Sequence, residues 1–258
     1  RDVKQPPGAL LSTAEVDLRL AGKTWDLPEP DPAFSQQLRG LLGGTMDGYA
    51  MAVLDLADPE HPRYAELRGD YKQNVGSVGK IAVVLALFQA LADHYPDDVE
   101  ARKRVLKSTI VTADTFSVRD GHTVRFYNPA TKALVRRPIQ VGDQASLFEF
   151  VDWMLSPSSN SAAGMVMREA MLLRQYGKSY PPSEEEIKRF FAQTPKAELT
   201  RLFEATFYEP VTRNGLSLER LRQGSFFTAG GKSMVPGAGD SYGTAPELLR
   251  YLLRMEQG

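Results

Sequence analysis

A serine and a lysine three residues apart stand at the start of the most apolar run in the chain. Ser77-Val78-Gly79-Lys80 directly precedes the run from Ile81 to Leu91. On a helix, residues three apart share one face, with Cβ atoms about 5–6 Å apart. An uncharged lysine amine at that distance can accept the serine proton and make the hydroxyl a nucleophile. The spacing therefore predicts covalent catalysis at Ser77, with Lys80 as the proton acceptor.

A purely structural interpretation of the same tetrad is also open. A Ser-x-x-Lys string is expected about once by chance in a chain of this length and average composition. Serine is among the best helix N-cap residues, and a first-turn lysine is often solvated. The apolar residues that surround Lys80 on every side of the helix favour its burial instead. Burial disfavours the charged amine and so lowers its pKa, as the catalytic interpretation requires.

A second polar cluster follows a break between two predicted helices. Ser146 and Glu149 form a capping box that predicts a helix over 147–155, and Pro157 interrupts the chain after it. Ser158-Ser159-Asn160 comes next, and a helix rich in small residues is predicted from 161 to about 174. These polar residues fit an ordinary loop after a proline. A second hydroxyl beside a neutral amine can also carry a proton to a leaving group.

Composition narrows the classes of function that the chain can have. The 258 residues are 42% hydrophobic and 24% charged, with a net charge of −1. These values are typical of a soluble globular protein, and no overall charge attracts nucleic acid or anionic lipid. The chain has no cysteine, and its three histidines lie at no metal-ligand spacing, so we expect no metal and no cofactor. No run of 18 apolar residues occurs, so we expect no membrane span.

The remaining elements predict an α+β fold. We expect an N-terminal arm with a short helix over residues 1–44 and a main domain over residues 45–258. Alternating patterns at 48–55 and 63–68 predict a hairpin of an antiparallel sheet. The later part of the chain is predicted to be mainly helical. Short strands or extended loop are expected at 123–127 and 133–141, and helix starts are expected at Ser183, Thr194 and Thr244.

Three motifs in this order resemble those of the penicillin-recognising serine enzymes, most closely the class A β-lactamases. They are Ser77-x-x-Lys80, Ser158-x-Asn160 and the later helix opened by Thr244-Ala245-Pro246-Glu247. The resemblance covers roughly residues 45–95, 140–175 and 239–258. It implies a β-lactamase/transpeptidase-like fold, in which an antiparallel sheet packs with helices beside a helical lobe.

The resemblance also implies a role for each motif residue. Ser77 would form the acyl-enzyme, its backbone N–H would supply half of an oxyanion hole, and Lys80 would take its proton. Ser158 would relay a proton to the leaving nitrogen, and Asn160 would bind the substrate amide or orient Lys80. The implied substrates are β-lactams or D-Ala-D-Ala-like peptidoglycan peptides. The implied location is the periplasm or the exterior, with no cofactor and no nucleic acid partner.

This sequence departs from the family pattern at three places. Ser159 stands where the S-D-N motif has Asp. The nearest string to the third motif, Lys-Thr-Gly, is Gly231-Lys232-Ser233-Met234, which precedes the Thr244 helix. We therefore expect the true triad in a further C-terminal segment; alternatively, another chain or another segment takes its place. The nearest match to the deacylating glutamate is Glu209 in Glu209-Pro210-x-x-x-Asn214, which is one residue longer than the family's loop.

Two functional alternatives follow from these departures. Without a deacylating base the acyl-enzyme would persist, as in a penicillin-binding D,D-peptidase or a poor β-lactamase. Alternatively, the chain is a non-catalytic descendant that keeps the fold as a binding or scaffold module. The sequence leaves the oligomeric state open.

Overall fold

The structure is a computed structural model. It describes residues 15–117, 120–128, 130–224, 226–227, 233–235 and 240–258. The chain divides into two compact units. Unit 1 consists of residues up to 71 together with 244–258, and unit 2 consists of residues 72–243. This division differs from the expected boundary between residues 44 and 45, because the first hairpin belongs with the N-terminal helix.

Unit 1 contains the predicted short helix and the predicted hairpin. Asp31 caps the helix by accepting a hydrogen bond from the Phe34 backbone N–H at 2.9 Å. The two strands pair antiparallel, with Met51 opposite Leu67, as the alternating pattern predicted. The elements are α1 (Pro32–Leu42), the 3₁₀ helix η2 (Gly43–Gly48), β1 (Met51–Asp55), β2 (Arg63–Leu67) and α9 (Ala245–Gln257).

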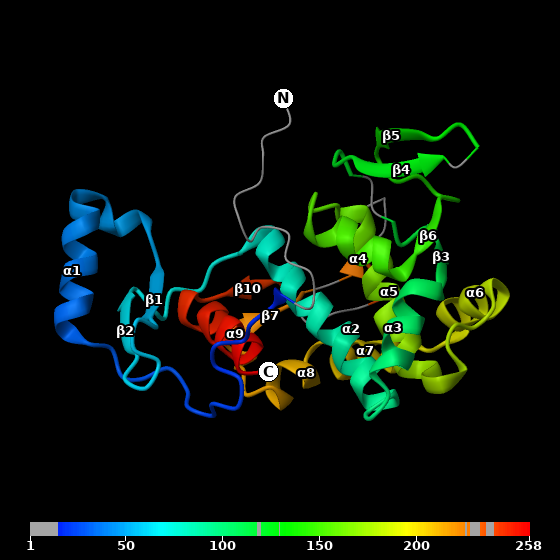
Figure 1. The fold of residues 1–258 in the computed structure, drawn as a ribbon. Helices are drawn as coiled ribbons and strands as arrows, with labels where there is room; N and C mark the ends of the chain where they lie inside the picture. Colours follow the sequence, from blue (N-terminus) through cyan, green and yellow to red (C-terminus); the bar gives the residue numbers. More distant parts are fainter. Residues whose placement is uncertain (1–14, 118–119, 129, 225, 228–232, 236–239) are drawn as a thin grey trace. The chain divides into compact units, whose positions relative to one another are not determined.

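Unit 2 is mainly helical (Figure 1). Its helices are η3 (Gly76–Gly79), α2 (Lys80–His94), α3 (Val99–Ser108), α4 (Leu147–Leu155), α5 (Asn160–Tyr176), η4 (Gly177–Ser179), α6 (Glu184–Gln193), α7 (Lys196–Phe207) and α8 (Glu209–Arg213). Its strands are β3 (Ile110–Thr112), β4 (Val124–Asn128), β5 (Ala133–Arg137), β6 (Gln144–Ser146), β7 (Leu221–Arg222), β8 (Phe226–Phe227), β9 (Ser233–Val235) and β10 (Tyr242–Gly243). Helices and small antiparallel sheets together confirm the α+β class.

Within the described residues the strands do not join into one sheet. They pair two by two and antiparallel, as β1–β2, β3–β6, β4–β5, β7–β10 and β8–β9. A two-stranded sheet is marginal in water by itself. These hairpins therefore depend on packing against helices for their stability.

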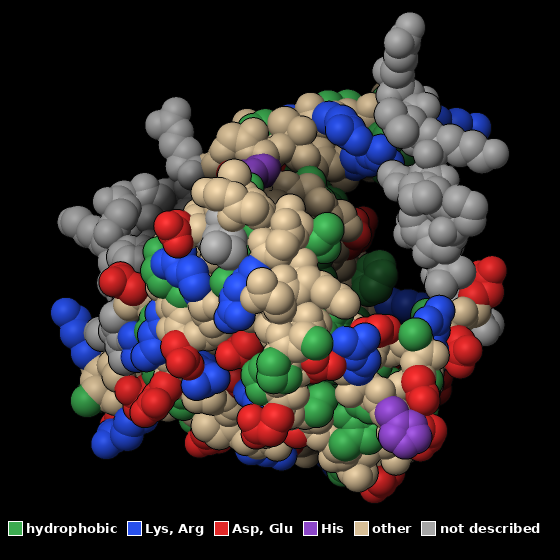
Figure 2. Space-filling model, turned by 90° about the vertical axis from the view of Figure 1, so that its left-hand side faces the viewer, with side chains coloured by type: hydrophobic (Ala, Val, Ile, Leu, Met, Phe, Trp, Pro, Cys, Tyr) green, Lys and Arg blue, Asp and Glu red, His purple; other side chains and the backbone are tan. Residues whose placement is uncertain are grey.

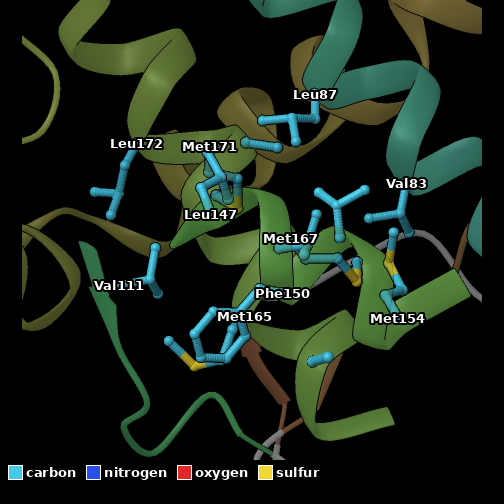
Figure 3. Packing of buried hydrophobic residues seen from close by; sticks show 14 of the residues in the cluster. Val83, Leu87, Val111, Leu147, Phe150, Met154, Met165, Met167, Met171 and Leu172 are labelled. Atoms are coloured by element: carbon cyan, nitrogen blue, oxygen red, sulfur yellow. The ribbon is translucent and has the colours of Figure 1, made fainter. Parts of the chain in front are cut away.

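The core of unit 2 is formed largely by α2, α4 and α5 (Figure 3). Val83 and Leu87 of α2 lie near the side chains of α4 and α5. The buried side chains include Met165, Met167 and Met171. Helix α2 is apolar on all sides and largely buried. Its first residue is Lys80, and the amine of this side chain therefore lies at the edge of the core.

The β4–β5 hairpin is anchored to α4 by aromatic contacts. The Phe126 ring lies 5.0 Å from the Trp153 ring, and the Arg137 guanidinium lies over Phe126 at 3.9 Å. Arg137 also pairs with Asp143 at 2.6 Å. These contacts hold the hairpin against α4. They thereby position residues 120–123, which directly precede β4.

Two features describe the charge and the apolarity of the molecule: the mixture of charges on one face and one long apolar helix. Figure 2 shows cationic and anionic side chains interspersed over one face. The segment Gly76–His94 is long and apolar enough to cross a bilayer by length and composition, but half of it is buried inside the protein, as in a core helix. Over the described residues, no group of three potential metal ligands occurs.

Candidate active site

A tight turn presents Ser77 at the start of α2. The Asn74 side chain accepts a hydrogen bond from the Gly76 backbone N–H at 2.9 Å, and Gly76 has a φ of +54° that favours glycine. Ser77 is exposed in the 3₁₀ turn that follows. The N-cap residues are Val75 for the turn η3 and Gly79 for α2. The Ser77 hydroxyl therefore does not cap a helix, which was the structural alternative that the sequence left open.

The Lys80 amine lies between two serine hydroxyls. Its Nζ is 3.2 Å from Ser77 Oγ and 3.0 Å from Ser158 Oγ. It also donates to the Ser158 carbonyl oxygen at 2.5 Å. Lys80 is only 8% exposed. The structure thus brings together three of the predicted catalytic residues from two segments that are far apart in the sequence.

The environment of Lys80 lowers its pKa. Burial is the main cause, since it disfavours the charged amine, and the negative charge of Asp120 raises the pKa by less. The net pKa lies below the ordinary value of 10.5. A neutral amine has a lone pair that can accept the Ser77 proton, while its N–H groups still donate to the Ser158 oxygens.

Ser158 adopts a backbone conformation that is rare for a residue other than glycine. Its φ is +64°, in the left-handed region. The next residue, Ser159, is fully buried, and its N–H donates to the Trp153 carbonyl at 2.9 Å. Its hydroxyl caps α5 by accepting from the Ala162 N–H at 3.2 Å. These bonds hold Ser158 in its strained conformation, and such strain is concentrated at functional sites.

Asp120 holds the Ser158–Asn160 loop from a segment that the sequence left unassigned. Its carboxylate accepts hydrogen bonds from Ser159 Oγ at 3.0 Å, from the Ser161 N–H at 3.3 Å and from the Asn160 N–H. The resembled motif has Asp where this chain has Ser159. Here a carboxylate meets that serine from 39 residues upstream. The detectable signal was the local turn chemistry of Asp120-Gly121-His122 just before a predicted strand.

The pKa of the Asp120 carboxyl is lowered from 3.8 to about 2. Burial of the carboxylate raises this pKa. Hydrogen bonds from the His122 side chain and from the backbone N–H groups of His122, Asn160 and Ser161 together lower it by more. Its side chain is 3% exposed. Asp120 is therefore a buried, ionised cap at the N-terminus of α5, where the helix dipole favours negative charge.

A cavity of about 540 Å³ opens beside Ser77 and Lys80. Asn160 lies on its wall, as a substrate-binding residue would, but it makes no hydrogen bond to Lys80. The volume suits a small-molecule ligand. The cavity is lined by Asn74, Gly76, Ser77, Lys80, Val83, Asn160, Ala163, Met167, Gln223, Asp240 and Ser241. The sequence analysis did not single out Gln223, Asp240 or Ser241, which come from the irregular segment near the end of unit 2.

Glu209, the predicted deacylating base, does not line this cavity. It lies at the start of α8, about half exposed, and accepts a hydrogen bond from Arg174. It borders a different cavity, together with Arg201 and Tyr208. The prediction rested on a short loop motif, whereas the local sequence forms a helical turn with Pro210 in its first turn.

The third motif is not placed by the structure. Gly231 and Lys232 lie outside the described residues. Thr244 caps α9 in unit 1, and its Oγ1 accepts from the Glu247 N–H at 3.4 Å, as the sequence predicted. No family model, curated protein or solved structure matches this chain. The candidate site therefore rests on its own geometry and on the resemblance in its motifs.

Asp120→Asn is expected to destabilise the protein at neutral pH. A carboxyl whose pKa is lower in the folded than in the unfolded state stabilises the fold above its unfolded pKa. The shift from 3.8 to about 2 corresponds to about 2 kcal/mol at most. Urea unfolding at pH 7 should show this loss, and the difference from wild type should shrink as the pH falls from 3.8 toward 2.

The matched control is Asp97→Asn, because Asp97 is exposed. This substitution should change the free energy of unfolding by less than about 0.5 kcal/mol. Equal stability of Asp120→Asn and wild type at pH 7 would show that the carboxylate does not hold the loop.

Proposed function

We propose that the protein is a serine hydrolase or acyl-transferase that forms an acyl-enzyme on Ser77. The observation that carries this proposal is the buried Lys80 amine, with a lowered pKa, in contact with both Ser77 Oγ and Ser158 Oγ beside a cavity of about 540 Å³. A hydroxyl with an adjacent base is the general arrangement of nucleophilic catalysis.

In the proposed acylation, Ser77 Oγ attacks the carbonyl carbon of a bound amide while its proton passes to the Lys80 lone pair. The oxyanion that forms accepts a hydrogen bond from the Ser77 backbone N–H, at the first turn of a helix where such groups are unpaired. The C–N bond then breaks, and the leaving nitrogen takes a proton from Ser158, which regains one from Lys80. The products of this step are the Ser77 ester and a free amine, still tethered to it if the amide was cyclic.

The proposed substrates and fold follow from the resemblance. The substrates are β-lactams or D-Ala-D-Ala-like peptides, and Asn160, on the cavity wall, binds the substrate amide. The proposed fold is β-lactamase/transpeptidase-like. Because peptidoglycan peptides lie outside the cytoplasmic membrane, the proposed location is the periplasm or the exterior. The mechanism uses no metal and no cofactor.

The proposed acyl-enzyme is long-lived. Deacylation needs a base that activates water beside the ester, and Glu209 is paired with Arg174 on the wall of another cavity. The position of Glu209 favours a penicillin-binding peptidase or a slow β-lactamase over an efficient β-lactamase.

Incubation of the full-length protein with a fluorescent penicillin is expected to give one stable adduct. Opening of the lactam ring has no leaving group, so the intact mass should rise by the whole mass of the probe. Peptide mapping should place the adduct on Ser77, and Ser77→Ala should abolish it. Ser108→Ala, at an exposed serine of α3, is the control and should keep full labelling.

Two results would contradict the proposal and favour a non-catalytic module. One is the absence of any adduct on the folded full-length protein. The other is labelling that persists in Ser77→Ala.

Glu209→Gln is expected to leave the lifetime of the acyl-enzyme unchanged, because the carboxylate lies away from the nucleophile. The measurement is the rate at which the fluorescent adduct is lost after free probe is removed. Arg174→Gln is a matched variant, since it breaks the same ion pair from the other side. A lifetime increased tenfold or more in Glu209→Gln alone would restore Glu209 as the deacylating base.

A further inference from the structure

A further cavity lies in unit 2, between β3, α5 and the start of α6. Its volume is about 380 Å³. Much of its wall is apolar, with Ile110, Val141 and Ile187 among its residues. Ile110 and Val141 are more than half exposed, which is unusual for aliphatic side chains in a folded domain. None of its lining residues belongs to the cavity beside Ser77.

The polar part of this cavity is a buried charged network. Arg168 of α5 is 4% exposed and donates from Nε to Glu169 Oε1 at 2.7 Å. Its NH1 donates to Asp114 Oδ2 at 2.5 Å and to the Thr112 carbonyl at 3.4 Å. The Tyr180 hydroxyl donates to the other oxygen of Glu169. Burial lowers the pKa of Arg168, but the two carboxylates raise it by more, so the guanidinium stays charged.

Among the residues that the structure describes, this network pairs two carboxylates, Asp114 and Glu169, with one guanidinium, that of Arg168. Glu169 is nearly fully buried, and both its oxygens accept hydrogen bonds. Asp114 accepts from Arg168 at Oδ2 and from the Phe116 N–H at Oδ1, at 2.8 Å, but about a third of its side chain is exposed where it borders the cavity. At the mouth, the exposed Glu184 and Lys188 offset each other. Placing a charge in a poorly solvated site is costly unless an opposite charge meets it.

We propose that this cavity binds a small amphipathic amine, with its ammonium group on Asp114 and its apolar part against Ile110, Val141 and Ile187. The ammonium neutralises the excess charge and forms a charge-assisted hydrogen bond with the exposed part of the carboxylate. Apolar walls with a few convergent polar groups are the usual composition of a small-molecule site. The site is independent of the acyl-enzyme chemistry at Ser77.

The test compares three probes of similar size with the full-length protein by isothermal titration calorimetry. They are 2-phenylethylamine, 2-phenylethanol and 3-phenylpropionate. The amine should bind at least about tenfold more tightly than the alcohol, and the acid should be the weakest, because a charge-assisted hydrogen bond to Asp114 exceeds a neutral one. Asp114→Asn should remove the advantage of the amine.

Val141→Trp tests the location without touching the charged network. Val141 is 69% exposed, so a larger side chain can be accommodated in the fold while it fills the cavity and abolishes binding. Leu134→Trp, at an exposed leucine of β5 away from the cavity lining, is the control and should bind normally. Ser77→Ala should also bind normally, which separates this proposal from the catalytic one. Equal affinity for the three probes, no binding of the amine, or full binding in Val141→Trp would overturn it.

Discussion

The account depends on a lysine amine at the edge of an apolar core that pairs with no carboxylate among the described residues. Lys80 is the first residue of α2, and the apolar residues that follow bury this helix and draw the amine out of water. Burial lowers its pKa, while the oxygens of Ser77 and Ser158 give it hydrogen-bond partners that carry no charge. Had a carboxylate occupied the place of either serine, the ion pair would have favoured the protonated amine and removed the base.

Asp120 has two opposing effects on the site. Its charge is needed to hold the Ser159–Ser161 segment at the start of α5, yet the same charge raises the pKa of Lys80. The carboxylate accepts hydrogen bonds from the hydroxyl of Ser159, from backbone N–H groups and from His122 rather than from the amine. Its effect on Lys80 is smaller than that of burial. The loop is thereby anchored by a carboxylate while Lys80 keeps a lowered pKa.

Local chemistry in the sequence was enough to predict most helix starts and the first hairpin. The capping boxes at Ser146 and Ser183 are both present, and the helix predicted over 147–155 has those bounds. These features depend on residues within four positions of one another, so a single sequence carries the signal. The order of the motifs also predicted that two distant segments meet, and the structure brings together Ser77, Lys80 and Ser158.

Long-range contacts explain what the sequence did not predict. Asp120 reaches Ser159 across 39 residues. The turn residues around Asp120 mark a loop but do not identify its partner. Glu209 is the opposite case. Its short motif looked suitable, but the side chain pairs with Arg174 in another part of unit 2. The strands pair two by two, and these pairings depend on which segments meet in space. Composition and alternation along the sequence do not determine those partners.

The most direct measurement is the ionisation of Lys80 itself. The full-length protein, labelled with ¹³C at the lysine ε-carbons, would be titrated by NMR, and Lys80→Arg would assign the signal by its loss. The account predicts a midpoint below the ordinary value of 10.5 for Lys80. A Lys80 midpoint at or above 10.5 would show that burial does not lower the pKa of this amine, and it would contradict the account.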